Sequence, residues 1–149
     1  MLSGNYEDMS ESKLQSEFVI WYKNTYPQER KRLFAVFNEG KNVTMKLGVG
    51  LTPGVCDLLY VRHGCVLNGF ELKIAGSYHS VKHIIDQCRW MLDVLPGNAW
   101  FCDNLEAFQM AIGGDASRCV SPEKVLDYCI SCRKKSIKWD EVSGFLVGK

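Results

Sequence analysis

Apolar side chains recur at the spacing of an α-helix in two long parts of the chain. The first part follows a capping box formed by Ser12 and Gln15 and stops at Pro27, so we expect a helix from residue 12 to about residue 26. The second part starts at Val81 and stops before Pro96-Gly97, a pair that ends helices. The two apolar faces comprise Leu14, Phe18, Trp21, Tyr22 and Thr25 in the first helix and Val81, Ile84, Ile85, Cys88, Met91, Leu92 and Leu95 in the second. Each face needs an apolar layer to cover it.

Short apolar runs between these helices are typical of strands. The expected strands are Leu33–Phe37, Asp57–Val61, Phe70–Ile74 and Ala99–Cys102, the first of them buried. Two further helices are expected, one from a cap at Asp103 or Asn104 to Ile112 and one from Ser121-Pro122 to about Lys134. We expect a turn over 38–40, a short helix over 42–49 and a loop over 77–80, and the pattern after Trp139 leaves the secondary structure open.

The order helix, strand, strand, strand, helix, strand, helix predicts an α/β fold in which helices flank a mixed sheet. The chain shows no internal repeat and no linker long enough to divide it. We therefore expect a flexible N-terminal arm over 1–11 and a main domain over 12–113. Residues 114–149 are expected to form a C-terminal helical extension packed on the same domain.

Charged residues interrupt the second and third expected strands, in the stretch PGVCDLLYVRHGCVLNGFELK. A hairpin whose connection is centred near Gly64 places Asp57 opposite Glu71. A rival register turns at Asn68-Gly69, which is a strong two-residue hairpin signal, and leaves Asp57 elsewhere. We favour the wider connection, because it keeps both apolar runs as full strands.

Further polar groups are expected on the same side as this hairpin. Glu71 and Lys73 are two positions apart and so share one face of their strand. Glu17 follows Leu14 by three residues, which places it at the edge of the buried stripe of the first helix. By the same spacing Gln87 lies at the edge of the apolar stripe of the second helix. The sequence therefore predicts that Asp57, Glu71, Lys73, Glu17 and Gln87 converge.

Clustered carboxylates repel one another and are driven toward protonation unless a cation joins them. Hard oxygen ligands suit Mg²⁺, with Mn²⁺ as a substitute, and waters and a substrate phosphate complete the shell. A lysine beside such a cation can serve the attacking water or neutralise a phosphate. The set is thus suited to hydrolysing a phosphodiester. The plainer interpretation of Glu71 and Lys73 alone is a salt bridge at the end of a strand.

The overall composition narrows the setting. The chain has 149 residues with a net charge of +1, so any basic surface for nucleic acid must be local. No apolar stretch approaches about 18 residues and the first residues are polar, so we expect neither a membrane span nor a secretory leader. The odd number of cysteines, seven, is typical of a reducing compartment, and we expect an intracellular protein, cytoplasmic or nucleoid-associated.

The ordered set of motifs resembles the PD-(D/E)XK nuclease superfamily, and within it the VRR-NUC branch of small stand-alone viral and phage-type enzymes. The residues concerned are Glu17, Asn38 with Gly40, Lys46-Leu-Gly48, Pro53-Gly-Val-Cys-Asp57, Phe70-Glu-Leu-Lys73 and Gln87. The similarity covers roughly residues 12–112. Cys56 stands where the family usually has proline, and residues 114–149 lie outside the match.

The resemblance implies a restriction-endonuclease-like αβββαβ core and a Mg²⁺-dependent DNA endonuclease. The implied metal ligands are Asp57, Glu71, the carbonyl of Leu72 and, as an outer or second-metal ligand, Glu17. Lys73 would serve the attacking water, and Gln87 would position water or backbone phosphate. Stand-alone members resemble Holliday junction resolvases, so the resemblance implies a homodimer that acts on branched DNA in recombination or repair. It also implies that the chain could be encoded by a phage and act inside a bacterial host.

Candidate DNA contacts lie on either side of these motifs. They are Lys41 and Lys46 before Asp57 and His79, Lys82 and His83 after Lys73, with a solvated surface or a structural histidine as the plainer interpretation of each. Two other functions stay open. One is a nuclease of nicking, flap or restriction-like specificity, and the other is a DNA- or partner-binding protein on a nuclease scaffold.

Overall fold

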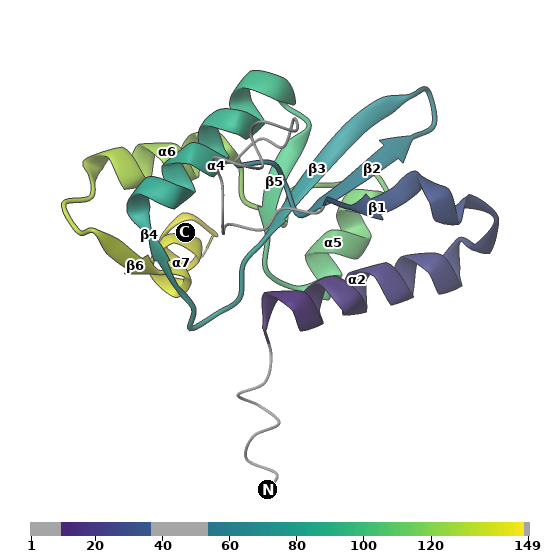
Figure 1. Cartoon of the computed structure of the whole chain (residues 1–149), viewed down its shortest axis with the longest axis horizontal. Coiled ribbons are helices and arrows are strands. Elements are labelled where there is room, and N and C mark those ends of the chain that lie inside the picture. Colours follow the sequence, from purple (N-terminus) through teal and green to yellow (C-terminus); the bar gives the residue numbers. More distant parts are fainter. Residues whose placement is uncertain (1–9, 37–53, 148–149) are drawn as a thin grey trace, which may run out of the picture.

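The computed structural model describes residues 10–36 and 54–147, and a four-stranded mixed sheet lies at the centre of this part of the chain (Figure 1). The strands are β1 (Leu33–Ala35), β2 (Leu58–Arg62), β3 (Val66–Leu72) and β5 (Ala99–Cys102), in the order β1-β2-β3-β5. The first two pairings are antiparallel and the pairing of β3 with β5 is parallel. Because β3 and β5 run the same way, their carboxyl ends meet at one edge of the sheet.

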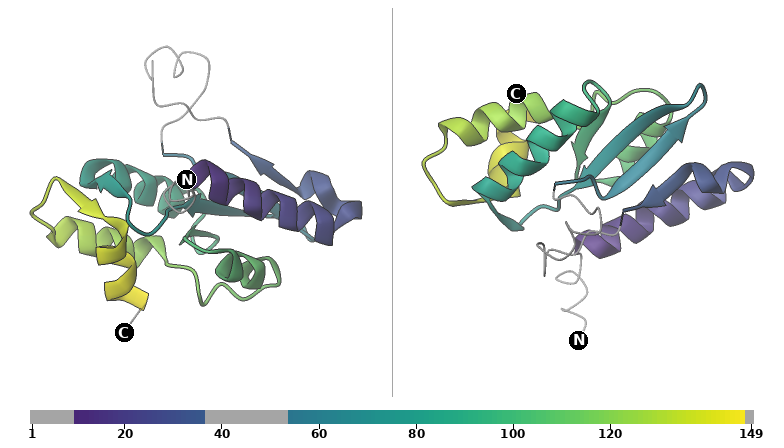
Figure 2. Two further views of the ribbon diagram at one scale, coloured as in Figure 1. Left: turned by 90° about the horizontal axis from the view of Figure 1, so that it is seen from below. Right: turned by 45° about the horizontal axis from the view of Figure 1, so that its top comes forward.

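Helices cover both faces of this sheet, so the predicted α/β class is confirmed. On one face pack α2 (Glu11–Thr25) and α5 (Leu105–Ile112), whose Phe18 and Phe108 rings stack with centroids 4.3 Å apart. On the other face pack α4 (Val81–Val94), α6 (Pro122–Ser131) and α7 (Trp139–Val147). Figure 2 shows α4 and α6 side by side, away from α2.

The register of the central hairpin is the one that the wider connection predicts. Leu58 pairs with Phe70 and Arg62 pairs with Val66, and the chain turns at Gly64 and Cys65, both with positive φ. The rival turn at Asn68-Gly69 is wrong, since both residues lie inside β3. A side chain at Gly69 would lie 2.8 Å from Cys56 Sγ, so this glycine serves close packing rather than a turn.

The first helix begins two residues earlier than the capping box predicts. Ser10 is its cap, and the Ser10 hydroxyl accepts a hydrogen bond from Lys13 N at 3.2 Å. The helix ends at Thr25, before Pro27, and a short 3₁₀-helix η1 (Pro27–Arg32) follows. The predicted helix starts at Ser121-Pro122 and Asn104 are confirmed, while α6 ends at Ser131, short of Lys134.

A second, two-stranded sheet was not predicted. Residues 77–80 were expected to be a loop, but β4 (Tyr78–Ser80) pairs antiparallel with β6 (Ser136–Lys138). Each strand is too short to show an alternating pattern, and the partner lies far along the chain. Residues 122–142 pack through this sheet and the helices around it onto α4, with Val125, Cys129, Ile137, Trp139 and Val142 buried.

The first strand is shorter and more exposed than predicted. Of its three residues only Leu33 is buried, and Phe34 is 44% exposed. β1 is the edge strand of the sheet, and its last two residues, Phe34 and Ala35, are exposed although they point to opposite faces. The predicted turn over 38–40 and helix over 42–49 lie outside the described residues. Among the described residues, no helix is both long and apolar enough to span a membrane.

Candidate functional site

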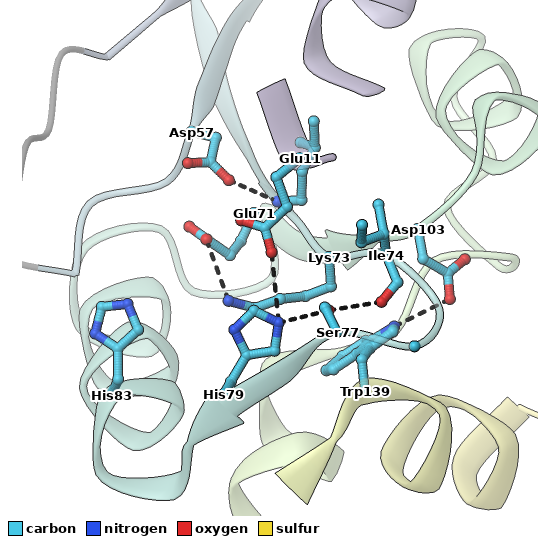
Figure 3. A network of polar contacts seen from close by, with 12 residues as sticks. Glu11, Asp57, Glu71, Lys73, Ile74, Ser77, His79, His83, Asp103 and Trp139 are labelled. Atoms are coloured by element: carbon cyan, nitrogen blue, oxygen red, sulfur yellow. Dashed lines mark hydrogen bonds and ion pairs between the residues drawn. The ribbon is translucent and has the colours of Figure 1, made fainter. Parts of the chain in front are cut away.

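Acidic and basic side chains meet at the edge of the sheet where β2 begins and β3 ends. Asp57 immediately precedes β2, and its Oδ2 accepts a hydrogen bond from Leu72 N at 2.8 Å. Glu71 lies in β3 and Lys73 directly follows this strand, and both are buried. Figure 3 shows the carboxylates of Glu11, Asp57 and Glu71 close to the side chain of Lys73. The hairpin register thus brings Asp57 beside the Glu71–Lys73 pair.

Two partners hold one oxygen of the Glu71 carboxylate. Lys73 Nζ lies 3.6 Å from Glu71 Oε2, and Gln87 Nε2 donates a hydrogen bond to the same oxygen at 2.9 Å. Gln87 comes from α4 and is buried, as its place beside the apolar stripe predicts. Lys73 Nζ also lies 6.0 Å from the centroid of the Phe101 ring on β5. The structure therefore brings Asp57, Glu71, Lys73 and Gln87 together.

The cluster contains more acceptors than donors. Glu71 Oε1 and Gln87 Oε1 are both buried, and neither has a hydrogen-bond partner. An unsatisfied buried polar atom costs about 1–3 kcal/mol. Burial raises the pKa of Glu71 well above its usual range, the charge of Asp57 raises it further, and Lys73 opposes both. This is the electrostatic setting into which a cation fits.

Glu11 occupies the place that the sequence suggests for Glu17. Glu17 is exposed, and Glu11 is the residue of α2 whose charge acts on Glu71. Successive helical residues lie about 100° apart, so Glu11 shares a face with Leu14 and Phe18, whereas Glu17 lies about 100° round from Phe18. The signal that identifies Glu11 is its spacing of three and seven residues from those two buried positions. Sequence reasoning missed it because the helix was expected to start at Ser12.

His79 connects Glu11 to the segment that follows Lys73. Its Nε2 lies 3.4 Å from Glu11 Oε2 and 2.8 Å from Ser77 Oγ, and the Ser77 hydroxyl donates to the carbonyl of Ile74 at 2.7 Å. Since the serine proton is used there, His79 Nε2 is the donor to Ser77. Burial and the charge of Lys73 lower the pKa of His79 to about 4, so the ring is neutral at pH 7.

Glu11 and His83 complete the surroundings of the cluster. Burial raises the pKa of Glu11, with Lys73 opposing and Asp57 adding to the rise. His83 Nε2 lies 3.2 Å from Gln87 Nε2, and burial of part of the ring and the charge of Lys73 lower the pKa of His83. Both histidines that were candidate DNA contacts therefore lie against the buried cluster.

The remaining predicted contacts lie apart from this cluster or outside the described residues. Lys82, in the first turn of α4, has an exposed side chain whose Nζ is 3.8 Å from Asp86 Oδ2. Lys41 and Lys46 fall in the segment 37–53, outside the described residues.

The residues present fit a divalent cation that is bound by two protein carboxylates, with water and substrate phosphate as the remaining ligands. No group of three or more His, Cys, Asp or Glu side chains within residues 10–36 and 54–147 is arranged to hold a metal. Asp57 and Glu71 supply two carboxylates, and Gln87 Oε1 and Glu71 Oε1 are acceptors without donors. Mg²⁺ is commonly bound through one or two carboxylates with water and substrate phosphate as further ligands. The donor set therefore suits Mg²⁺ or Mn²⁺, which prefer oxygen ligands.

No protein-family model, curated protein or solved structure matches this chain. The similarity to PD-(D/E)XK nucleases consequently stays a prediction from the motifs.

Proposed function

We propose that this protein is a Mg²⁺-dependent DNA endonuclease of the PD-(D/E)XK type, with Mn²⁺ able to substitute. The observation that supports it most is the convergence of Asp57, Glu71 and Lys73 around two buried oxygens that have no donor. The element order also agrees with an αβββαβ core: α2, then β1, β2 and β3, then α4 and β5. We extend the proposal to a homodimer that selects branched DNA, on the strength of the resemblance.

The roles follow from the contacts. Asp57 and Glu71 would hold a divalent cation, which when bound would supply a Lewis acid for the phosphate and an activated water. Lys73 has its ammonium at that position, and it can donate to a phosphate oxygen as charge develops there. Gln87 fixes the orientation of the Glu71 carboxylate through its 2.9 Å hydrogen bond. Asp57 is oriented in turn by the main-chain N–H of Leu72.

A purely structural salt bridge accounts for less of what is observed. It explains Lys73 beside Glu71, but one ammonium faces three carboxylates, those of Glu11, Asp57 and Glu71. A buried ion pair is stable only when its charges and lone pairs are matched. The excess of acceptors is instead what a cation-binding site requires, and it favours the enzyme over a plain structural cluster.

The experiment is a cleavage assay on a labelled four-way DNA junction and a matched linear duplex, each with Mg²⁺, Mn²⁺ or EDTA. We expect cutting with either metal and none with EDTA. Lys73→Ala should lower the cleavage rate at saturating protein by about 10²- to 10³-fold, because it removes a donor aimed at the developing charge. The matched control is Lys124→Ala, which removes an exposed lysine of α6 and should cut normally.

The outcomes separate the alternatives. Paired nicks on the junction alone support a junction resolvase, and cutting of the linear duplex as well retains the nuclease without the branch selectivity. Cutting by Lys73→Ala at the rate of the Lys124→Ala control contradicts the proposed site. Tight binding without cutting in either metal indicates a DNA-binding protein on a nuclease scaffold.

A further inference from the structure

The outer face of the two-stranded sheet presents an aromatic ring next to a lysine. Tyr78 pairs with Lys138, and His79 pairs with Ile137. Because side chains alternate along a strand, His79 and Ile137 point inward, whereas Tyr78 and Lys138 lie on the outside. Tyr78 is 67% exposed, and Lys138 Nζ lies 5.6 Å from the centroid of its ring. We call this pair of strands the ribbon.

A groove of about 800 Å³ adjoins the ribbon between α4 and the end of α6. Ser80, the last residue of β4, is part of its wall, so the ribbon and the groove form one continuous surface. Its charged lining residues are Lys82, Asp86, Arg89, Lys134 and Lys135. Four cations against one carboxylate make the groove basic, in a chain whose net charge is only +1.

The cations of the groove are available to a ligand. The ion pair between Lys82 and Asp86 is exposed on both sides, with Nζ and Oδ2 3.8 Å apart. Lys134 Nζ lies 2.9 Å from Glu141 Oε1, but its side chain is 61% exposed. Such exposed pairs hold their partners weakly, so a polyanion can compete for them. Arg89 and Lys135 are exposed as well.

We infer that the ribbon and the groove bind the DNA substrate next to an unpaired nucleotide, whose base stacks on Tyr78. Phosphates of the adjoining strand would contact Lys82, Arg89, Lys134, Lys135 and Lys138. This inference rests on the proposed function for the choice of DNA as the ligand. It adds a substrate class: DNA with an unpaired base beside a duplex, such as a gap, a flap or an open branch.

The aromatic ring is what favours nucleic acid over an acidic peptide. Either polyanion would satisfy the cations, but an exposed ring flanked by lysine is the arrangement that stacks bases while holding their phosphates. Tyr78 directly precedes His79, whose ring contacts Glu11 at the edge of the buried cluster. The side chains of Tyr78 and His79 point to opposite faces of β4, so a base stacked on Tyr78 would lie across this strand from the buried cluster.

The test of stacking is a binding titration in EDTA, where no cleavage occurs. The probes are a duplex with a one-nucleotide gap that leaves one 2-aminopurine unpaired and the same duplex fully paired. Tyr78→Ala should weaken binding to the gapped probe by about 5- to 100-fold and abolish quenching of the 2-aminopurine, since it removes one base–aromatic stack. Binding to the paired duplex should change less than about 2-fold, and Tyr78→Phe should behave as the wild type on both.

The test of the groove uses charge reversal with a matched control. Arg89→Glu with Lys135→Glu should reduce the slope of log K against log salt by about 2, because two phosphate contacts are lost. Arg118→Glu with Lys124→Glu makes the same change of net charge at exposed positions that do not line the groove, and its slope should stay near that of the wild type. Equal losses in both double variants would overturn the groove as a specific site. Tighter binding of polyglutamate than of DNA of equal charge would assign it to an acidic partner instead.

The two proposals fail in different ways. Gap-dependent binding that needs Tyr78, without cutting in Mg²⁺, supports this surface and contradicts the endonuclease. Normal cutting in Mg²⁺ together with unchanged gapped-DNA binding by Tyr78→Ala overturns this surface and leaves the endonuclease intact.

Discussion

The chain places similar charged pairs in two very different settings. In the buried cluster, the side chains of Lys73 and Glu71 are 2% and 4% exposed. In the groove, those of Lys82 and Asp86 are 87% and 49% exposed. Water screens the second pair but not the first, so the same chemistry has different consequences.

The difference indicates what each charge is for. In the cluster every charge acts on its neighbours: the pKa of Glu71 rises, the pKa of His79 falls, and two oxygens lack donors. Such an arrangement lowers stability, which is typical of sites that bind or react. In the groove no single pair has a large effect, and only the sum of the cations produces affinity for a polyanion.

The strongest way to break this contrast is to let water into the cluster. Trp139 is fully buried and packs on Phe101, with ring centroids 5.4 Å apart, and Phe101 lies beneath Lys73. Trp139→Ala should lower the free energy of unfolding by about 3–5 kcal/mol, measured by urea denaturation, because it leaves a large cavity.

The control for that change keeps the ring. Trp139→Phe retains an aromatic surface but loses the hydrogen bond from Nε1 to Asp103 Oδ2, 3.0 Å long. It should cost no more than about 2 kcal/mol. Equal losses in the two variants would show that packing behind Lys73 is unimportant.

The second largest effect is expected from acid, which should lower the stability of the protein through His79, beside the buried cluster. The pKa of His79 is about 4 in the folded protein, below its usual value, so the unfolded chain binds a proton first as the pH falls from about 6.5. His79 therefore lowers stability progressively between about pH 6.5 and 4, by about 1–3 kcal/mol. Burial lowers the pKa of His79 most, the charges of Lys73 and His83 lower it further, and Glu11 faces the same ring.

Urea denaturation across this pH range tests the prediction. His79→Gln should flatten the loss of stability between pH 6.5 and 4. The matched control, His63→Gln, removes a histidine that is 70% exposed and paired with Glu29, and it should follow the wild type because solvent screens that pair. A loss of the same steepness in His79→Gln as in the control would mean that His79 does not titrate as described.

A smaller effect on stability is expected when one carboxylate of the cluster is neutralised. Asp57→Asn removes one of the repelling carboxylates and keeps an oxygen that can accept from Leu72 N. In metal-free buffer it should raise the free energy of unfolding by about 1 kcal/mol, because the burial of Glu71 becomes less costly. A lower melting temperature for Asp57→Asn in EDTA would contradict the view that the two carboxylates repel.

The smallest effect is expected in the exposed groove. Lys134→Ala breaks the ion pair with Glu141, which is exposed on the lysine side. Its urea midpoint should be indistinguishable from that of the wild type, because solvent screens the pair. A clear loss of stability would mean that the groove is a structural network and not a surface held open for a ligand.

Local signals account for what could be predicted of the cluster. The register of β2 and β3 followed from keeping both apolar runs intact, and it places Asp57 beside Glu71. The inward position of Gln87 followed from its spacing to Ile84 on a strongly periodic helix. Both depend on residues close together in the sequence.

The features that the sequence did not predict, the place of Glu11 and the pairing of β4 with β6, depend on more than a local pattern. Ser10 and Ser12 are both acceptable helix caps, and only a start at Ser10 places Glu11 inside the helix, on the face of Leu14 and Phe18. The ribbon depends on the pairing of Tyr78 with Lys138, two short segments whose contact is set by the packing of α6 and α7. No local pattern specifies such a pairing, and the exposed Tyr78 could not be assigned from the sequence.

The central claim is that Asp57 and Glu71 form a cation site, and calorimetric titration with Mg²⁺ in the absence of DNA tests it most directly. The wild type should show saturable binding that Asp57→Asn abolishes. Asp93→Asn, which removes an exposed carboxylate of α4, should retain it. Binding by Asp57→Asn as tight as that of Asp93→Asn would contradict the claim.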